Sequence, residues 1–388
     1  MKSNRIIGLD LHPDVFAAAA LSGANPLEAR TEWVHDRQET ARLETWAKKH
    51  LVPGDTVVME ASGNSFEVAH RLHGCGITAI VLESAQASHI RHNFCNDDRH
   101  SAVKLARVYL SGLAKTVWQP DAVTRERREV FFAHRNAVKD TTRGRSRIRS
   151  FANEYCVRLP AGTALTQESG RQAVLSSRAW TPLQTELIRQ MFEQLWAGEQ
   201  RRKALERVMV RELAGHPAWA RLWRLMGVRH RVAFALMAMI GDIHRFPTAK
   251  KLVGYLGLSP RREQSGNDAR GREQGLGANG RGDVRALLIQ SAQNALEQRE
   301  SPLHKWGWKL AMKKHRHHAV AAVARKLAVA IWHLLMGHFT PLVEASTHLT
   351  TKLLKLATLL GRDTLNQLGF ANRQAFVDQQ IKLIQLST

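Results

Sequence analysis

An aspartate lies near the middle of the first apolar run of this chain, where the sequence predicts a buried β-strand. Residues 5–12 read Arg-Ile-Ile-Gly-Leu-Asp-Leu-His, so that Asp10 interrupts a row of apolar side chains. Acidic residues are depleted in strands, and a buried carboxylate is costly unless a cation or a metal compensates its charge. Asp10 is therefore predicted to be either a salt-bridged acid of the core or a metal ligand.

A second acid repeats this pattern. Glu60 closes the apolar run 56–59 and precedes the turn-like sequence Ala-Ser-Gly-Asn. Two acids on strand-like segments favour a carboxylate cluster that binds Mg²⁺, because Mg²⁺ prefers hard oxygen ligands. Asp10 and Glu60 need only lie on neighbouring strands for their carboxylates to converge.

The charge of the chain indicates a polyanionic partner. It has 57 Lys and Arg against 34 Asp and Glu, a net charge of +23, which favours nucleic acid through counterion release. The three cysteines lack metal-type spacing, so neither a disulfide framework nor a zinc site is expected. We see no signal peptide, and apolar stretches such as 233–240 are too short to cross a bilayer. A cytoplasmic protein without a membrane partner is expected.

The pattern of the 388 residues predicts four regions. Residues 1–118 alternate strand and helix patterns and predict an α/β domain with a mixed sheet flanked by helices. Residues 119–215 predict a basic, coiled-coil-like region of long helices, residues 216–345 a mostly α domain, and residues 346–388 a helical tail. The expected strands of the first domain are 6–11, 15–21, 31–34, 56–60 and 78–82, and its expected helices are 39–50, 66–73 and 102–113.

Residues 123–150 carry nine Lys and Arg against three acids. A charge run is most often a solvated face, but this excess of one sign favours a helix that follows phosphates. A leucine-rich stripe from Leu183 onward either packs within the chain or pairs with a second protomer. The candidate nucleic-acid-binding residues of the long helices are Arg125, Arg128, Arg143, Arg145, Arg147 and Arg149. Downstream, Lys313, Lys314 and Arg316 begin a basic helix that is expected to face nucleic acid.

Two groups of motifs resemble one known family. The first is Ile7-Gly8-Leu9-Asp10, Met59-Glu60-Ala61-Ser62-Gly63 and Asn96-Asp97-Asp98 with the helix that follows. The second is Tyr255-Leu256-Gly257-Leu258-Ser259-Pro260-Arg261-Arg262-Glu263-Gln264-Ser265-Gly266, with Gly280 and Arg285-Ala286-Leu287-Leu288 downstream. Together they resemble the DEDD transposases of insertion sequences, which include bridge-RNA-guided recombinases and are related to Piv-type DNA invertases. The resemblance covers about residues 5–118 and 219–340.

The resemblance implies a fold and a chemistry. It implies an RNase H-like, RuvC-type N-terminal domain and a C-terminal transposase domain with a nucleophilic serine, Ser265. Asp10, Glu60 and Asp98 match the family's first three acids and would hold Mg²⁺. The family also implies donor and target DNA, a structured guide (bridge) RNA, a homo-oligomer (dimer or tetramer) and a bacterial, nucleoid-associated cytoplasmic location. Arg261, Arg262 and Arg270 would bind phosphate or stabilise charge near Ser265.

Position 101 departs from the family. The fourth acid should fall three residues after Asp98, but Ser101 stands there and carries no negative charge. The neighbouring Asp97 is an acid one residue too early on a helix start. The site is therefore weakened, rewired through Asp97, or inactive. Two alternatives stay open beside the serine transposase: a RuvC-like, metal-dependent junction nuclease, and a non-catalytic nucleic-acid-binding relative.

Overall fold

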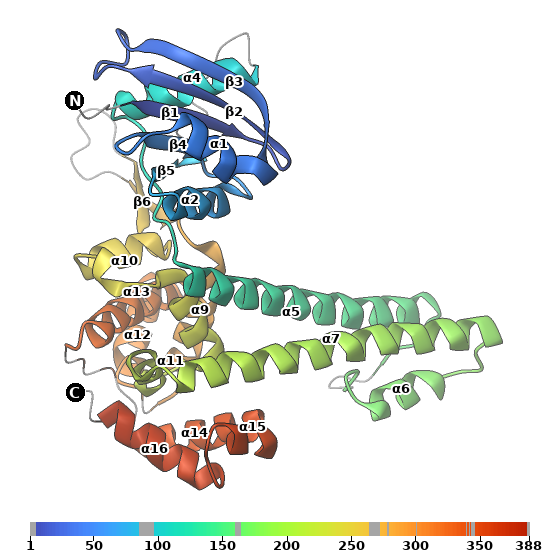
Figure 1. Ribbon diagram of the computed structural model, residues 1–388. Coiled ribbons are helices and arrows are strands. Elements are labelled where there is room, and N and C mark those ends of the chain that lie inside the picture. Colours follow the sequence, from blue (N-terminus) through green and yellow to red (C-terminus); the bar gives the residue numbers. More distant parts are fainter. Residues whose placement is uncertain are drawn as a thin grey trace. The chain divides into compact units, whose positions relative to one another are not determined.

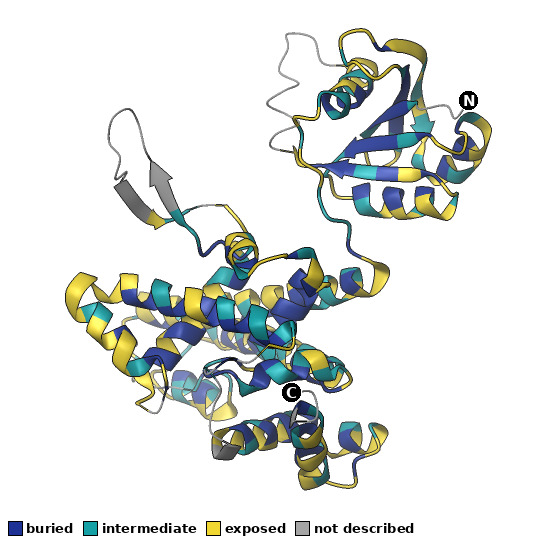
Figure 2. Cartoon of the chain, turned by 90° about the vertical axis from the view of Figure 1, so that its left-hand side faces the viewer, coloured by how far each residue is buried: buried dark blue, intermediate teal, exposed yellow. Residues whose placement is uncertain are grey.

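The chain folds as two compact units, residues 1–121 and 122–388, each described here by itself. The computed structural model describes residues 5–84, 97–159, 164–263, 272–277, 279–299, 301–338, 340, 342 and 346–385, of which 261–263, 272–274, 346, 347 and 385 are described by backbone alone. Buried residues concentrate in the sheet of the first unit and on the inward faces of the helices (Figure 2). The finer division of residues 122–388 stays a prediction, because one core spans them from Phe131 to Ile384.

The first unit is a five-stranded mixed sheet with the order β3-β2-β1-β4-β5 (Figure 1). The strands β1, β2 and β3 pair antiparallel, whereas β1, β4 and β5 pair parallel. This arrangement agrees with the predicted mixed sheet. The strand bounds are Ile6–Leu11 for β1, Val15–Ser22 for β2, Arg30–Glu39 for β3, Thr56–Glu60 for β4 and Thr78–Leu82 for β5. The prediction made β3 too short, because its second half, residues 35–39, is polar throughout and has no apolar pattern.

Helices cover both faces of this sheet. Helices α1 (Leu43–His50) and α2 (Ser65–Gly74) pack on Leu9, Val57 and Met59 on one face. Helix α4 (Asp98–Leu110) packs on the other face through Ala102 and Ala106, against a cluster of Ile6, Ala17, Ala19, Leu21 and Val58. Strand residues alternate between the two faces, so odd and even positions of β1 belong to different cores. The predicted helix 102–113 starts four residues earlier than expected.

Gly8 lets α4 lie directly on β1. A Cβ atom at Gly8 would fall 1.8 Å from the carbonyl oxygen of Ala102 and 3.0 Å from the amide nitrogen of Ala106. Such overlap with backbone cannot be relieved by a side-chain rotation. The small residues Ala17 and Ala19 of β2 continue the same flat surface under α4. The sequence Gly8 to Asp10 thus couples the position of α4 to the strand that carries the acid.

The second unit begins with two long helices. Helices α5 (Ala122–Glu154) and α7 (Pro182–Ala214) run side by side as an arm, with the short α6 (Glu168–Leu175) beside its far end (Figure 1). Thr181 and Gln184 form a capping box, with Pro182 in the first turn, and this explains where α7 starts. The buried Glu206 of α7 joins the two helices, because His134 of α5 contacts its carboxylate at 3.2 Å.

The remainder of the second unit is helical around one core. Within it, α9 is apolar on all sides and nine consecutive residues, 232–240, are buried. Helix α13 is long and apolar enough to cross a bilayer by length and composition, contrary to the expectation that such stretches are too short. Nine of its residues are buried, eight of them in this core. The elements are α8 (Pro217–Ala220), η2 (Arg221–Arg224), α9 (His230–Ile240), η3 (Ile243–Arg245), α10 (Ala249–Tyr255), β6 (Pro260–Glu263), β7 (Arg272–Leu276), α11 (Gly282–Glu297), α12 (His304–Lys314), α13 (Arg316–Leu335), α14 (Ser346–Leu360), α15 (Arg362–Gln367) and α16 (Arg373–Gln385).

Replacing Gly8 by alanine tests the close approach of α4 to β1. We expect Gly8→Ala to lower the free energy of unfolding by about 3 kcal/mol, because the new methyl group overlaps the backbone of Ala102. Urea unfolding measures the change in the free energy of unfolding, and hydrogen exchange of the α4 amides shows whether the helix is loosened. The matched control is Gly74→Ala, where a Cβ meets no atom within 4 Å, and it should stay within about 0.5 kcal/mol of the parent. Equal stability of the two variants would contradict this account of the contact.

Candidate functional site

Asp10 and Glu60 end two neighbouring parallel strands. In the register of β1 and β4, Gly8 pairs with Val58 and Leu9 with Met59, so Asp10 and Glu60 are the next residues on their strands. Side chains alternate along a strand, and Val58 packs under α4. Asp10 and Glu60 therefore face the same side of the sheet as α4. For their carboxylates to converge, the two acids had to lie on neighbouring strands, and they do.

Asp98 joins this edge of the sheet because it is the first residue of α4. Asp10, His12 and Asp98 each offer a ligand atom, and these atoms all lie within 4.8 Å of one another. His12 Nε2 lies 3.3 Å from an oxygen of Asp98, and both side chains are about half exposed. The structure thus brings together Asp10 and Asp98 as predicted. Glu60 lies on the adjacent strand and is not a member of this three-residue group.

His12 is a site residue that the sequence analysis missed. It follows β1 at the start of the turn to β2, and its carbonyl oxygen accepts a hydrogen bond of 2.9 Å from the side chain of Asn64. The one feature of the sequence that could have identified it is its position directly after the strand, two residues beyond Asp10. Carboxylates suit Mg²⁺ and Mn²⁺, whereas an imidazole is a ligand that later transition metals such as Fe²⁺ and Zn²⁺ accept more readily. The donor set fits a divalent cation and does not by itself specify Mg²⁺.

Asp97 has a structural role, whereas Asp98 belongs to the group of possible metal ligands. It is the N-cap of α4, and its Oδ1 accepts hydrogen bonds of 2.7 Å from both the backbone N–H and the ring Nδ1 of His100. The hydrogen bonds from the backbone and the ring of His100 lower the pKa of the Asp97 carboxyl group. This cap fixes the first residue of α4 at Asp98, whereas the sequence analysis began the helix at position 102.

Ser101 occupies the position at which the fourth acid was expected. It lies three residues after Asp98 on α4, hence on the same side of the helix, and it is half-buried. Its backbone N–H donates to the carbonyl oxygen of Asp97 at 2.9 Å. Because the carboxylate of Asp97 caps the helix, it does not take the place of an acid at position 101. The geometry favours a site with one carboxylate fewer over a site rewired through Asp97.

The second motif forms the base of a β-hairpin in the second unit. The backbones of Gly257 and Gly280 touch, since a Cβ at Gly280 would lie 2.7 Å from Gly257 Cα, and both glycines have positive φ. Arg285 Nη1 donates to the carbonyl oxygens of Gly257 at 3.2 Å and Gly277 at 2.5 Å. The hydroxyl of Tyr255 donates to the carbonyl oxygen of Met239 at the end of α9. These motif residues therefore hold the two ends of the hairpin β6–β7.

In the sequence, the predicted nucleophile falls between the segments that form β6 and β7. Ser265 and Arg270 fall outside the described residues, and the side chains of Arg261 and Arg262 also lie outside the description, although their strand is present. The structure therefore gives the hairpin base from Pro260 to Leu276 and not the geometry of Ser265.

The arginines of α5 divide into two kinds. Arg128 is half-buried and donates to the carbonyl oxygens of Ala238 and Met239 at the end of α9; burial lowers the pKa of its guanidinium group. Arg128 thus has a part in the fold. Arg125 is also half-buried. By contrast, the four candidate arginines in the second half of α5 are exposed: Arg143, Arg145, Arg147 and Arg149.

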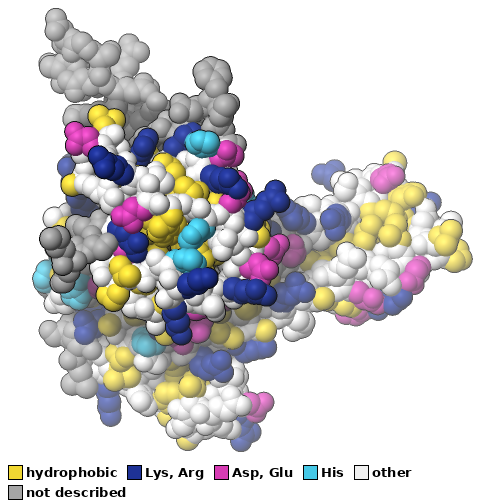
Figure 3. Space-filling model, turned by 45° about the horizontal axis from the view of Figure 1, so that its top comes forward, with side chains coloured by type: hydrophobic (Ala, Val, Ile, Leu, Met, Phe, Trp, Pro, Cys, Tyr) yellow, Lys and Arg dark blue, Asp and Glu magenta, His cyan; other side chains and the backbone are white. Residues whose placement is uncertain are grey.

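The four exposed arginines flank the seam between the long helices. Gly144 and Ile148 face α7, where a Cβ at Gly144 would lie 3.3 Å from a methyl carbon of Leu195. With about 100° between successive residues, Arg143 and Arg147 lie on one side of that seam and Arg145 and Arg149 on the other. Figure 3 shows Lys and Arg side chains along the arm, interspersed with acidic ones. Lys313, Lys314 and Arg316 are exposed as well, and Arg316 pairs with Glu297 at 2.6 Å.

A cationic hollow that the sequence analysis missed lies near the start of α9. It has a volume of about 370 Å³ and no acid among the residues that line it. Three of its basic residues, Arg229, Arg299 and Lys355, are exposed. They come from the N-cap of α9, the end of α11 and the middle of α14. Their separation in the sequence left no motif that could have identified them. The lining residues are Arg229, Gln298, Arg299, His348, Thr351, Lys352 and Lys355.

Comparisons with known proteins agree with the second motif. Residues 220–306 match the profile of the transposase IS116/IS110/IS902 family. The chain is 25% identical to the transposase for insertion sequence element IS1111A of Coxiella burnetii over 345 residues, or 86% of this chain and 90% of that protein. It is also 25% identical to a "Probable family 20 transposase" of Pseudomonas aeruginosa over 340 residues, covering 85% and 96%. The chain is therefore similar to transposases of insertion sequences over most of its length, and to the IS116/IS110/IS902 family profile within its second unit.

The first prediction from this site concerns divalent metal binding. We expect Ser101→Asp to tighten the binding of Mn²⁺ or Mg²⁺ by about tenfold, because it adds a charge and an oxygen donor beside Asp98. Asp98→Asn should weaken binding by a similar factor, since it removes a member of the group. Electron paramagnetic resonance of Mn²⁺ or calorimetry with Mg²⁺ measures both changes.

Asp97→Asn is the matched control for metal binding, because asparagine caps a helix about as well as aspartate. Metal affinity should stay near that of the parent in this variant. A large loss of affinity in Asp97→Asn, with no gain in Ser101→Asp, would show that Asp97 is a ligand and would overturn this interpretation.

The second prediction concerns the arm. Replacing Arg143, Arg145, Arg147 and Arg149 together by Gln should weaken binding of structured RNA and of duplexes of unrelated sequence alike. It should also flatten the salt dependence of binding, by up to ~0.9 log unit for each duplex phosphate that is no longer bound. Fluorescence anisotropy at several salt concentrations measures the slope. The control places Gln at Arg362, Arg373 and Lys382 of the tail helices, which also lowers the net charge. An equal loss of affinity per charge in both variants would leave the arm with no specific role.

Proposed function

We propose that this chain is a DNA transposase that joins strands by metal-dependent phosphoryl transfer, with Ser265 as the nucleophile. Its similarity to IS110/IS116 transposases supports the transposase activity and donor and target DNA as its substrates. The observation that carries the finer proposal is the group of Asp10, His12 and Asp98 at the carboxyl edge of the sheet, with Glu60 on the adjacent strand. The strand order and the placement of α4 are also the basis on which we propose an RNase H-like, RuvC-type fold.

In this proposal the serine carries the covalent step. Ser265 Oγ forms a bond to the scissile phosphorus while the bond from phosphorus to the departing DNA oxygen breaks; the serine gives up its proton and the departing oxygen gains one. The resulting serine–DNA phosphodiester keeps the energy of the original bond, so a hydroxyl of another strand can replace the serine without ATP. Mg²⁺, when bound by Asp10, Glu60 and Asp98, supplies neutralisation of phosphate charge.

Other residues would position the nucleic acid. Arg261, Arg262 and Arg270 flank Ser265 in the sequence and are proposed to bind the phosphates beside it. The exposed arginines of the arm are proposed to bind a structured guide RNA, because an extended basic surface suits a folded polyanion. The leucine stripe of α7 still exposes Leu183 and Leu187, with 84% and 45% of their surface accessible, and this supports a homo-oligomer.

Ser101 favours one alternative. A site with one carboxylate fewer would bind metal weakly, and the chain would then be a non-catalytic nucleic-acid-binding relative of the active transposases. A RuvC-like junction nuclease, the other alternative, would cut DNA with no covalent protein–DNA product. The two alternatives and the proposal therefore differ in two measurable products, the cut strand and the covalent adduct.

Replacing the proposed nucleophile tests the function. Ser265→Ala should abolish strand exchange and the covalent protein–DNA adduct while nucleic-acid affinity stays within about twofold of the parent, because only one hydroxyl is removed. The adduct is detected as a DNA-dependent mass shift after denaturation, in the presence of Mg²⁺ and the RNA that co-purifies with the protein. Ser259→Ala, in the same motif but before the hairpin, is the matched control and should retain the adduct. Strand exchange at the parent rate by Ser265→Ala would rule out the nucleophile role.

A further inference from the structure

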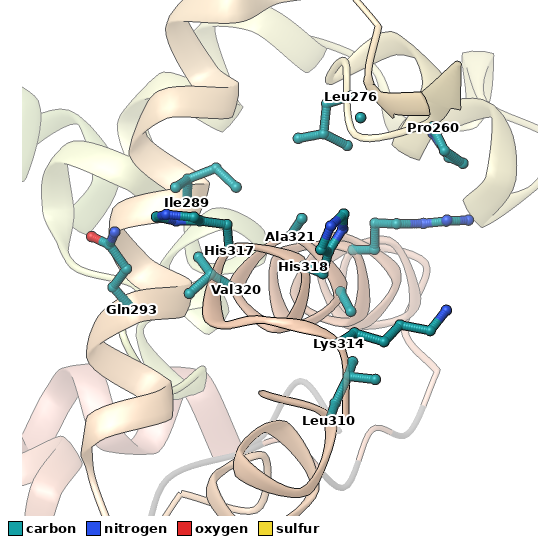
Figure 4. A pocket seen from close by; sticks show the side chains of 13 residues that line it. Pro260, Leu276, Ile289, Gln293, Leu310, Lys314, His317, His318, Val320 and Ala321 are labelled. Carbon is teal, nitrogen blue, oxygen red and sulfur yellow. The ribbon is translucent and has the colours of Figure 1, made fainter. Parts of the chain in front are cut away.

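A second hollow lies at the base of the β6–β7 hairpin. It has a volume of about 880 Å³ and is bounded by Pro260, Gly275 and Leu276 of the hairpin and by residues of α11, α12 and α13 (Figure 4). Pro260 precedes Ser265 by five residues along the chain. The hollow therefore adjoins the two strands that precede and follow Ser265 in the sequence. Neither the motifs nor the proposed function assigns it a role.

The walls of this hollow are apolar. Leu276 faces it from the hairpin, Ile289 from α11, and Leu310 from α12, while Val320 and Ala321 form the side made by α13 (Figure 4). A surface that binds only the phosphates of a duplex requires cations, and apolar walls would add nothing to that binding. These walls instead suit the flat, weakly polar face of a nucleobase that has left its stack.

The rim of the hollow is lined by Lys, Arg and His side chains. Lys314, His317, His318 and Arg325 line it, and the lining residues that the structure describes include no acid. His317 lies beside Ile289 and Gln293, and His318 lies between α13 and Leu276 (Figure 4). Lys314 and Arg325 are exposed, so they can reach phosphates outside the hollow. The amide of Gln293 offers both a donor and an acceptor to the edge of a base.

We propose that this hollow takes one unpaired DNA nucleotide close to the strand that is cut. Its base lies against Leu276, Ile289 and Val320, and Lys314 and Arg325 bind the phosphates on either side of it. This inference rests on the proposed function, since it takes DNA as the substrate of the hairpin. Holding a base out of the stack leaves the adjoining backbone extended and accessible to a nucleophile on the hairpin.

The test compares two DNA probes of the same sequence. One is a fluorescein-labelled 20-base-pair duplex, and the other carries a two-nucleotide mismatch at its centre. We expect the parent to bind the mismatched probe about tenfold more tightly, which corresponds to about 1.4 kcal/mol, because an unpaired base can enter the apolar hollow and a paired base cannot. Fluorescence anisotropy measures both affinities. Equal affinities of the parent for the two probes overturn the proposal.

Filling the hollow provides the matched variant. Ala321→Trp places an indole in the hollow from a half-buried position, and the preference for the mismatched probe should fall to less than about twofold while duplex affinity is kept. Ala371→Trp adds the same side chain at an exposed site that does not line the hollow, and it should keep the preference. If thermal melting shows that Ala321→Trp is misfolded, the double variant Lys314→Gln/Arg325→Gln at exposed positions replaces it. A preference that survives in the folded variant overturns the proposal.

Two further measurements separate the possible occupants and functions. An unpaired RNA strand that competes better than DNA of the same sequence would make RNA the occupant and would overturn the proposal. Ser265→Ala should keep the preference for the mismatched probe, because the hollow does not include the serine. If the parent forms the covalent adduct but does not prefer the mismatched probe, only the proposed role of the hollow is refuted. If the parent prefers the mismatched probe but forms no adduct, only the proposed role of Ser265 is refuted.

Discussion

The contact between the backbone of α4 and Gly8 of β1 is the constraint on which the acid site depends. Because no Cβ separates them, the helix lies as close to the strand as backbone atoms allow, and Ala17, Ala19 and Ala102 keep the same closeness around it. The start of α4 is then fixed by the Asp97 cap, and Asp98 comes to lie beside Asp10. A carboxylate on a helix and a carboxylate on a strand converge without any long loop having to position them.

The sequence predicted the strands of this site better than its helix. The apolar runs that end in Asp10 and Glu60 gave both strands with the observed bounds, because buried parallel strands have a strong local pattern. Helix α4 was placed four residues too late, because its first turn, Asp98 to Ser101, is polar and only its cap marks the start. His12 had no periodic signal at all, since a turn residue is brought to a site by the strand pairing and not by its own pattern.

In the second unit, the roles of the arginines and of the second motif depend on tertiary contacts that have no pattern in the sequence. An excess of arginine on α5 predicted a basic surface, yet Arg128 holds the end of α9. The exposed arginines that flank the seam with α7 are Arg143, Arg145, Arg147 and Arg149. Gly257, Gly280 and Arg285 were identified only as parts of the second motif; the structure shows that they fix the base of a hairpin. Both hollows combine residues far apart in the chain, which only the packing of the helices brings together.

The absence of an acid at position 101 would couple the binding of metal to the binding of DNA. A chain with a net charge of +23 repels free cations, and a group with two converging carboxylates compensates little of that repulsion. Magnesium sites that act on phosphates commonly combine one or two carboxylates with oxygens of the substrate itself. A DNA phosphate at this edge of the sheet would therefore supply the charge and the oxygen that Ser101 does not. By thermodynamic linkage, metal would then tighten DNA binding by the same factor as DNA tightens metal binding.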